Sequence, residues 1–192
     1  MDYSISKLSS TERIGLVFDL YRKFGQEDYI GEPVSQIEHM SQSAQIAENE
    51  GHDEEVILAA FFHDIGHLCV SQGEVKTMDG YGVLSHEKIG ADFLRMLGFP
   101  ERIAKLVENH VQAKRYLTYR HPAYFEKLSE ASRKTLEFQG GKMNEKEAVA
   151  FETDPLFELS LKMRTWDEMA KEENVPLPDL DKYILMANRV LS

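Results

Sequence analysis

The chain is poor in cysteine, in positive charge and in long apolar runs. Only one of its 192 residues is a cysteine, Cys69, so an internal disulfide framework is excluded and a reducing cytoplasm is expected. No apolar run approaches the length of a membrane span, and none near the start resembles a secretion signal. With 22 basic and 33 acidic residues, the net charge is −11. This charge argues against a nucleic-acid partner, whose phosphates need a basic surface.

The apolar residues recur with helical spacing, and no segment has the alternation typical of a strand. Together with glycine and proline positions, this spacing predicts helices at 11–24, 34–49, 53–68, 85–97, 100–116, 124–138, 145–153, 156–171 and after the turn at 177–179. Ser85 is expected to cap the fourth helix, and 70–82 to form a loop. We therefore expect an all-α fold of eight to ten helices, forming a single domain over 1–192.

The segment LAAFFHDIGHL at 58–68 places His63, Asp64 and His67 at the end of an apolar run. In a continuous α-helix these three side chains would fall within an arc of about 100°. Buried polar groups without partners cost on the order of several kcal/mol, and a metal ion suits two imidazoles and a carboxylate. The alternative at this point is a histidine pair in the core, hydrogen-bonded to Asp64.

Further histidines favour the metal interpretation. Five of the seven lie on predicted helices near an apolar face, namely His39, His63, His67, His86 and His110. The other two, His52 and His121, have polar surroundings typical of the surface. With Asp64 and Asp167, these side chains exceed the three or four that one metal ion usually takes. The surplus suggests two metal ions, bridged by Asp64.

The order His39, His63-Asp64, His86, His110, Asp167 resembles the HD-domain superfamily of all-α metal-dependent phosphohydrolases, in its dinuclear branch. Nine segments more specifically resemble the PhnZ-type HD oxygenases: YIGE at 29–32, QIEH at 36–39, HDIGH at 63–67, GYGV at 80–83, HEKIGAD at 86–92, HVQAKRYL at 110–117, ASRKTLE at 131–137, QGG at 139–141 and RTWDE at 164–168. They span 29–168, whereas residues 1–10 and 170–192 match no part of the pattern.

This resemblance implies an HD-domain helical bundle with a dinuclear metal site between helices. The site would hold mixed-valent Fe(II)/Fe(III) and use O2 to cleave the C–P bond of a 1-hydroxyphosphonate supplied by an upstream hydroxylase. The resemblance assigns one iron to His39, His63, Asp64 and Asp167, and the other to Asp64, His86 and His110. The iron pair would bring a charge of about +5, enough to attract an anionic substrate into an acidic protein.

The resemblance also implies the substrate contacts. Tyr29 would occupy the second iron before substrate arrives, and Glu32 would face the substrate's amine. The phosphonate would be bound by His67, Lys114, Ser132 and Arg164. We expect His67 and Tyr29 to act in catalysis as well. Two simpler interpretations stay open here: Lys114 as a solvated surface charge, and Arg164 as the ion-pair partner of Asp167.

Two substrates fit the resemblance. A 2-amino-1-hydroxyethylphosphonate would give phosphate and glycine, and its 2-(trimethylammonio) relative would give phosphate and glycine betaine; the sequence leaves the choice open. Two other functions are also open. One is a dinuclear-metal HD phosphohydrolase that attacks a nucleotide or phosphomonoester with metal-bound hydroxide. The other is a non-catalytic HD module that senses a ligand.

Overall fold

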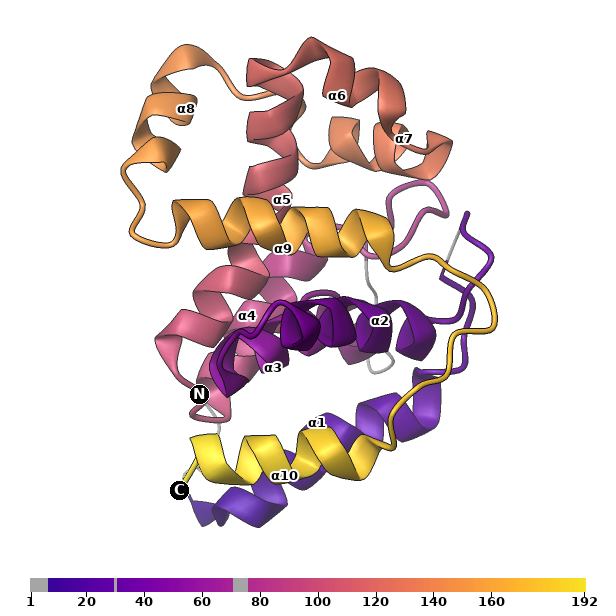
Figure 1. The fold of residues 1–192 in the computed structure, drawn as a ribbon, viewed down its shortest axis with the longest axis vertical. Coiled ribbons are helices and arrows are strands. Elements are labelled where there is room, and N and C mark those ends of the chain that lie inside the picture. The colour runs from indigo at the N-terminus through magenta and orange to yellow at the C-terminus, as the bar shows by residue number, and fades with distance from the viewer. Residues whose placement is uncertain (1–6, 30, 71–75) are drawn as a thin grey trace.

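The computed structural model describes residues 7–29, 31–70 and 76–192. Ile30 of the YIGE segment and 71–75 of the expected loop lie outside the described residues. In chain order (Figure 1), the helices are α1 (Ser10–Phe24), α2 (Gln36–Asn49), α3 (Glu54–Phe62), the 3₁₀-helix η2 (Ile65–Val70), α4 (His86–Met96), α5 (Glu101–Arg120), α6 (Pro122–Lys127), α7 (Glu130–Phe138), α8 (Glu145–Glu152), α9 (Phe157–Met169) and α10 (Leu180–Val190). Strands are absent from the described residues, which contain only two isolated bridges. The expected all-α class is therefore confirmed.

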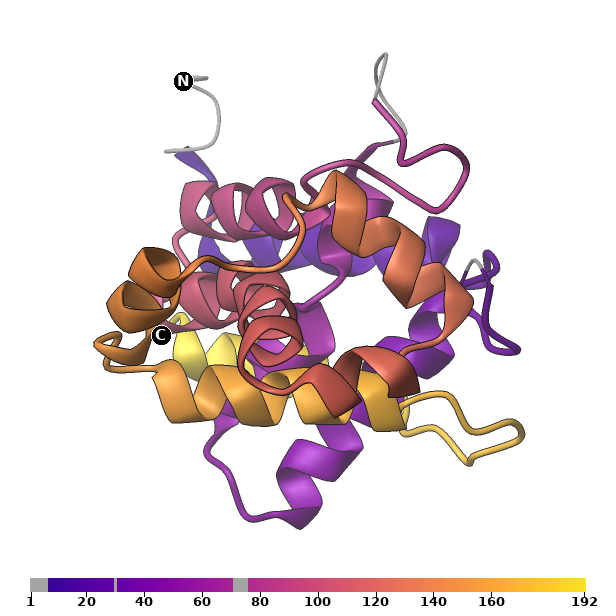
Figure 2. The same ribbon diagram turned by 90° about the horizontal axis from the view of Figure 1, so that it is seen from above.

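Helix α3 lies at the centre of the bundle. It packs against α2, α5, α9 and α10, while α4 packs against both α5 and η2. In Figure 1, α1 and α10 lie side by side below this group, and α6, α7 and α8 gather around the far end of α5. Figure 2 shows α8 on one side of that end and α6 and α7 on the other. Most of the core lies around α3, where α1, α2, α4, α9 and α10 also contribute. A second, smaller apolar cluster includes residues of α5 and α8.

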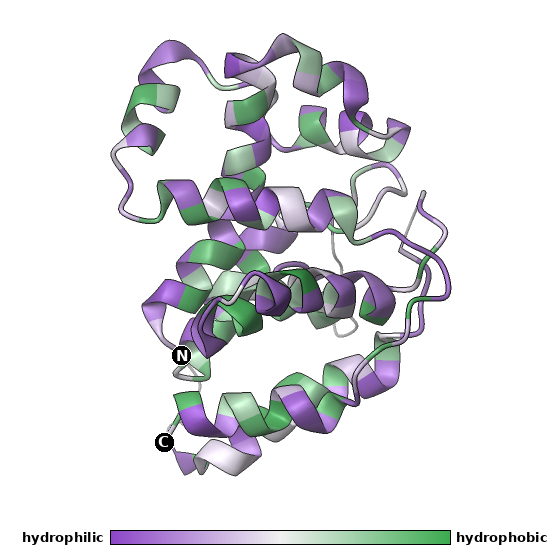
Figure 3. Ribbon diagram, in the orientation of Figure 1, coloured by the Kyte–Doolittle hydropathy of each residue, from purple (hydrophilic) through white to green (hydrophobic). Residues whose placement is uncertain are grey.

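Local sequence explains where several helices begin. Ser9, Ser35 and Asn144 each form a capping box with a glutamate three residues later, and Asp53 accepts a hydrogen bond from the backbone of Val56. Residues 56–62 of α3 are all buried, as its apolar composition requires. The outer helices instead alternate hydrophobic and hydrophilic residues along their length (Figure 3). Among the described residues, no helix combines the length and apolar character needed to cross a membrane.

The central helix ends earlier than the sequence predicts. It stops at Phe62, residues 63–64 form a turn, and the chain continues as η2, where the His67 N–H donates to the Asp64 carbonyl at 2.9 Å. The prediction of one α-helical arc for His63, Asp64 and His67 is therefore wrong. Tight packing accompanies the change, because a Cβ on Gly66 would lie 1.9 Å from the His86 carbonyl oxygen.

Three smaller differences concern helix ends. The helix expected over 124–138 is split into α6 and α7, because Ser129 caps a new helix through the Ser132 N–H. Helix α5 continues to Arg120, beyond the expected end at residue 116. Ser85 occupies the N-cap position of α4, but its φ is 59° and its side chain makes no capping hydrogen bond. Its expected role as a side-chain cap is therefore wrong.

Candidate metal centre

Six buried side chains converge between the helices. They come from α2, the turn after α3, α4, α5 and α9, and are His39, His63, Asp64, His86, His110 and Asp167. Segments more than 100 residues apart in the chain thus meet at one point. The geometry of this cluster (the His/Asp cluster below) determines what it could hold.

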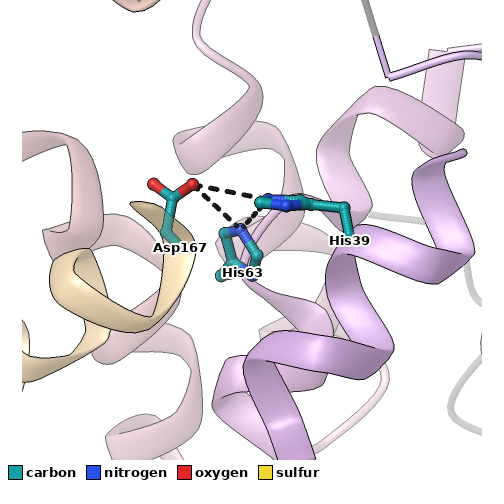
Figure 4. A group of neighbouring side chains, drawn as sticks. All are labelled: His39, His63 and Asp167. Carbon is teal, nitrogen blue, oxygen red and sulfur yellow. Dashed lines mark hydrogen bonds and ion pairs between the residues drawn. The ribbon is translucent and has the colours of Figure 1, made fainter. Parts of the chain in front are cut away.

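The first half of the His/Asp cluster joins α2, the end of α3 and α9 (Figure 4). The Nε2 atoms of His39 and His63 are 2.9 Å apart. Asp167 Oδ1 lies 3.4 Å from the first and 3.9 Å from the second. Three donor atoms therefore surround one point, at distances that could accommodate a metal ion.

The second half lies on the other side of Asp64. His86 Nε2 is 3.2 Å from His110 Nε2. Asp64 Oδ1 is 3.2 Å from His86 Nε2 and 3.4 Å from His110 Nε2. Its Oδ2 is 3.6 Å from Nε2 of both His39 and His63. Each oxygen of Asp64 thus faces one histidine pair, which is the arrangement a bridging carboxylate requires.

Backbone carbonyl oxygens fix which ring nitrogen of each clustered histidine carries hydrogen. The Nδ1 atoms of His39, His63, His86 and His110 lie 2.9, 2.8, 3.2 and 2.6 Å from the carbonyl oxygens of Ala170, Ala60, Val83 and Val107. A carbonyl oxygen can only accept, so Nδ1 is the donor in every case. In the neutral ring, Nε2 then carries a lone pair directed into the cluster, as in metal-binding histidines.

This arrangement fits metal ions. Two lone pairs facing each other at 2.9 Å repel unless a cation lies between them. Burial lowers the pKa of His63 to about 4, so this ring has little tendency to supply a proton. Asp167 Oδ1 is buried and has no hydrogen-bond partner among the described residues. A metal ion would satisfy all three atoms at once.

His67 differs in its tautomer from the four histidines of the His/Asp cluster. Its Nδ1 accepts a hydrogen bond from the Val83 N–H at 3.1 Å, and its ring stacks on His86 at 4.1 Å. Burial lowers the pKa of His67 to about 3, so the ring is neutral and its hydrogen is on Nε2. Distance alone would group His67 with Asp64 and His86 as a metal site. With Nε2 protonated, His67 is instead suited to donate a hydrogen bond to an anion.

A cavity opens beside the His/Asp cluster. Its wall includes His67 and three residues from α7 and its C-terminal end, Ser132, Thr135 and Gln139. Among the described residues, the charged ones in this wall are Glu32, Asp64, Asp167, Lys114, Arg164 and Lys171. These three acids and three bases balance, so bound metal cations would make this part of the cavity more positive within an acidic protein.

Lys114 is not a solvated charge. Its side chain enters the cavity wall from α5, is only 3% exposed, and donates to Thr135 Oγ1 at 2.7 Å and Gln139 Oε1 at 2.8 Å. Burial, assisted by the charge of Arg164, lowers its pKa to about 7. A buried lysine with only neutral hydrogen-bond partners is suited to an anionic ligand.

Arg164 does pair with Asp167, and it has further partners. The guanidinium donates to Asp167 Oδ2, to Ser132 Oγ at 3.0 Å and to Tyr124 OH at 2.8 Å, and it lies 2.9 Å from Glu168 Oε1. Burial would raise the pKa of Asp167, but the charge of Arg164 together with the contacts to His39 and His63 outweighs burial and holds that pKa well below its usual range. Arg164 therefore helps to keep Asp167 ionised within the His/Asp cluster.

Tyr29 and Glu32 also line the cavity. The Tyr29 ring stacks on His39 at 4.0 Å, and burial raises the pKa of its phenol well above the usual value. Glu32 is paired with Lys171 at 2.5 Å. Lys171 was missed in the sequence, where its one signal is its position four residues after Asp167. Gln36, three residues before His39, also lines the cavity and was missed.

The HD-domain family model matches residues 37–154, more than half of the chain. The chain belongs to the HD-domain family. An uncharacterized protein of Acanthamoeba polyphaga mimivirus is 44% identical to this HD-domain protein, over 90% of the chain and 78% of the relative. A [1-hydroxy-2-(trimethylamino)ethyl]phosphonate dioxygenase (glycine-betaine-forming) of Leisingera caerulea is 38% identical over 97% and 94%. A hydroxymethylphosphonate dioxygenase of Gimesia maris is 36% identical over 94% and 88%. The resemblance to PhnZ-type HD oxygenases is thereby confirmed.

Proposed function

We propose that this HD-domain protein is a di-iron oxygenase that uses O2 to cleave the C–P bond of a 1-hydroxyphosphonate, releasing phosphate. The observation that carries the proposal is the His/Asp cluster, in which two histidine pairs direct bare Nε2 atoms toward the two oxygens of Asp64. The two relatives named as phosphonate dioxygenases support the same reaction. The chain would act as one domain in the cytoplasm, on a substrate supplied by a hydroxylase.

The proposed metal ligands are those implied by the sequence. His39, His63, Asp64 and Asp167 would hold one iron, and Asp64, His86 and His110 the other. A mixed-valent iron pair would supply the redox chemistry with O2 and would add to the positive charge of Lys114 and Arg164. The role of the protein is to hold the carboxylates ionised and the imidazoles in one tautomer. The carbonyl contacts of the four Nδ1 atoms and the ion pair between Arg164 and Asp167 serve this purpose.

The phosphonate would bind between α5, α7 and η2. The Lys114 ammonium and the Arg164 guanidinium would offset its negative charge, and Ser132 would add a hydroxyl group. His67 would donate its Nε2 hydrogen to a phosphonate oxygen. Tyr29, whose raised pKa keeps the phenol protonated, would make way for the substrate's 1-hydroxyl group. At the other end of the cavity, Glu32 would face a cationic tail, either a primary ammonium or a trimethylammonium group.

The direct test is to measure O2 uptake and phosphate release by iron-loaded protein. The substrates are 2-amino-1-hydroxyethylphosphonate, its trimethylammonio relative and hydroxymethylphosphonate. We expect one phosphate per O2, and loss of most activity in Lys114→Met. Lys105→Met, in which a half-exposed lysine of the same helix is replaced, is the matched control. Mössbauer spectra of freshly purified protein should show an Fe(II)/Fe(III) pair.

The opposite outcome is equally clear. Phosphate release from a phosphomonoester or nucleotide without O2, with no cleavage of any hydroxyphosphonate, would contradict the oxygenase proposal and indicate a phosphohydrolase. Ligand binding without turnover of either substrate class would indicate a sensor.

A further inference from the structure

The side chain of Lys171 forms an ion pair with Glu32, the carboxylate proposed to face the substrate's tail. Its Nζ lies 2.5 Å from Glu32 Oε1, and the two side chains are only 20% and 11% exposed. Both residues line the cavity beside the His/Asp cluster. The protein therefore already places an ammonium group on Glu32, and this ammonium group belongs to the chain itself.

Backbone hydrogen bonds on both sides fix the position of Lys171. The preceding carbonyl, of Ala170, accepts from His39 Nδ1 at 2.9 Å. The following residue, Glu172, makes two hydrogen bonds to the Gln42 amide, at 2.9 Å through its carbonyl and at 3.1 Å through its N–H. These contacts hold the segment after α9 against α2. The ion pair is thus part of the cavity and not an accidental contact of a surface lysine.

The charges that line the cavity determine how this ion pair affects substrate binding. The carboxylates of the cavity among residues 7–29, 31–70 and 76–192 are Glu32, Asp64 and Asp167, and the latter two belong to the His/Asp cluster. Glu32 is left to attract a cation at the tail end, and Lys171 already neutralises it. A cationic tail must therefore displace Lys171, whereas a substrate without such a tail leaves the ion pair intact. Displacing a charge-assisted hydrogen bond in a partly buried site reduces the net gain from binding the tail.

A second observation indicates that the cavity can accept one more hydrogen-bond donor. Gln36 lies one helical turn before His39 and lines the same cavity. Its side chain is 7% exposed, and its Oε1 is buried without a hydrogen-bond partner among the described residues. An N–H group of a primary ammonium could satisfy this oxygen, whereas a trimethylammonium group has no N–H to donate.

We propose that Lys171 is a specificity-determining residue, which competes with the substrate's cationic tail for Glu32, and that Gln36 favours a tail bearing N–H groups. This inference rests on the proposed function. It adds that Lys171 sets the preference between hydroxyphosphonates with a cationic tail and those without a tail.

The test compares substrates within each variant. For wild type and Lys171→Met, kcat/KM is measured with 2-amino-1-hydroxyethylphosphonate and with hydroxymethylphosphonate, which has no tail. The dissociation constants of both are measured anaerobically by calorimetry. We expect Lys171→Met to raise the preference for the ammonium substrate about tenfold, which corresponds to about 1.4 kcal/mol. Using a ratio removes the general effect of losing one positive charge near a dianion.

Lys182→Met is the matched control, because Lys182 forms an ion pair with Glu48 of α2 that lies outside the cavity wall. It should leave the substrate ratio unchanged. A ratio that is unchanged or lower in Lys171→Met would overturn the proposal. If no hydroxyphosphonate is cleaved, the proposed function fails, but the ratio of dissociation constants still decides the role of Lys171. Absence of binding by either phosphonate would overturn both proposals.

The role of Gln36 has its own comparison. Gln36→Met should lower kcat/KM for the primary ammonium substrate several-fold and leave the trimethylammonium substrate nearly unaffected. An equal loss of kcat/KM for both substrates, or no loss for either, would overturn the role proposed for Gln36. Thermal melting of each variant shows whether the fold is retained.

Discussion

At the scale of single residues, hydrogen-bond partners determine which ring nitrogen of each clustered histidine carries hydrogen and which oxygen of Asp64 faces each histidine pair. Three of the four histidines in the His/Asp cluster direct Nδ1 to the carbonyl oxygen three residues earlier, so the local chain sets the tautomer. Asp64 then presents one oxygen to each histidine pair. This division makes Asp64 the residue on which both proposed metal sites depend.

We expect Asp64→Ala to lose both metal ions, because each proposed site would lose an oxygen ligand and the charge that both share. Asp167→Ala should lose the ion beside His39 and His63 and retain much of the other. Metal content per chain, measured after purification, distinguishes these outcomes. Asp92→Ala, an exposed carboxylate on α4, is the control. An Asp64→Ala protein that keeps two irons and a normal circular dichroism spectrum would contradict the bridge.

Lys114 should make stability depend on pH. Burial lowers its pKa from 10.5 to about 7. The charged form is therefore disfavoured in the folded protein, and this cost grows as the pH falls from about 10 toward 7. Lys114→Met removes this cost. As the pH is lowered from about 9.5 to 7, the Tm of Lys114→Met relative to that of wild type should therefore rise by several degrees.

The measurement of Lys114→Met uses protein freed of metal by a chelator, so that metal release does not contribute. Lys105 on the same helix is half-exposed, so Lys105→Met should show no such trend. A Tm difference between Lys114→Met and wild type that stays constant over this pH range would contradict the depressed pKa.

At the scale of elements, the break after α3 is the decisive local feature. The turn at 63–64 and the 3₁₀-helix η2 bring His63 and Asp64 to the cluster while η2 passes close to the start of α4. Gly66 makes this approach possible, because a side chain there would collide with the backbone of His86. An uninterrupted α-helix would give a different direction to His67, which the structure holds against Val83 and His86.

We expect Gly66→Ala to lower the stability by about 3 kcal/mol or more, because the backbone of α4 must move to admit a Cβ. The same substitution at Gly15 in α1 is the matched control. A Cβ there meets nothing within 4 Å, so Gly15→Ala should stabilise the protein by about 0.5–1 kcal/mol. Denaturant unfolding of both variants measures the difference. Equal free energies of unfolding in Gly66→Ala and wild type would contradict the close approach of Gly66 to the backbone of His86.

At the scale of the whole molecule, the His/Asp cluster joins distant parts of the chain. The family match ends at residue 154, yet Asp167 and Lys171 reach the cluster and the cavity from beyond it. Helix α9 packs on α2, α3 and α5, and α10 packs on α1 and α3. These contacts support the proposal that the chain forms one domain over 1–192.

Removing the metal ions should destabilise the whole bundle, because the facing Nε2 atoms and the buried Asp167 oxygen would lose their partner. A ligand present at about 100 times its dissociation constant stabilises by about 2.7 kcal/mol. For a protein of this size, that corresponds to a fall in Tm of roughly 5–10 °C on chelation. Restoring Fe(II) should recover it, and a Tm insensitive to both treatments would contradict metal binding at this cluster.

The sequence by itself determined the helical class, most helix positions and the set of polar side chains worth examining. These follow from local spacing: apolar residues every three to four positions, glycines and prolines between helices, and the adjacent pair His63-Asp64. The motifs also indicated the family, which the comparisons confirm. The assignment of six metal ligands stays a prediction, although the structure brings all six side chains together.

Only the tertiary structure decided how these groups face one another. It ended the central helix at Phe62, buried Lys114, directed Arg164 to both Asp167 and Ser132, and brought Lys171 to Glu32 across 139 residues of chain. None of this follows from spacing along one helix, because each contact joins segments whose relative position depends on how the helices pack. Tautomers and the charge balance of the cavity depend on such contacts, and so does the proposed preference between substrates.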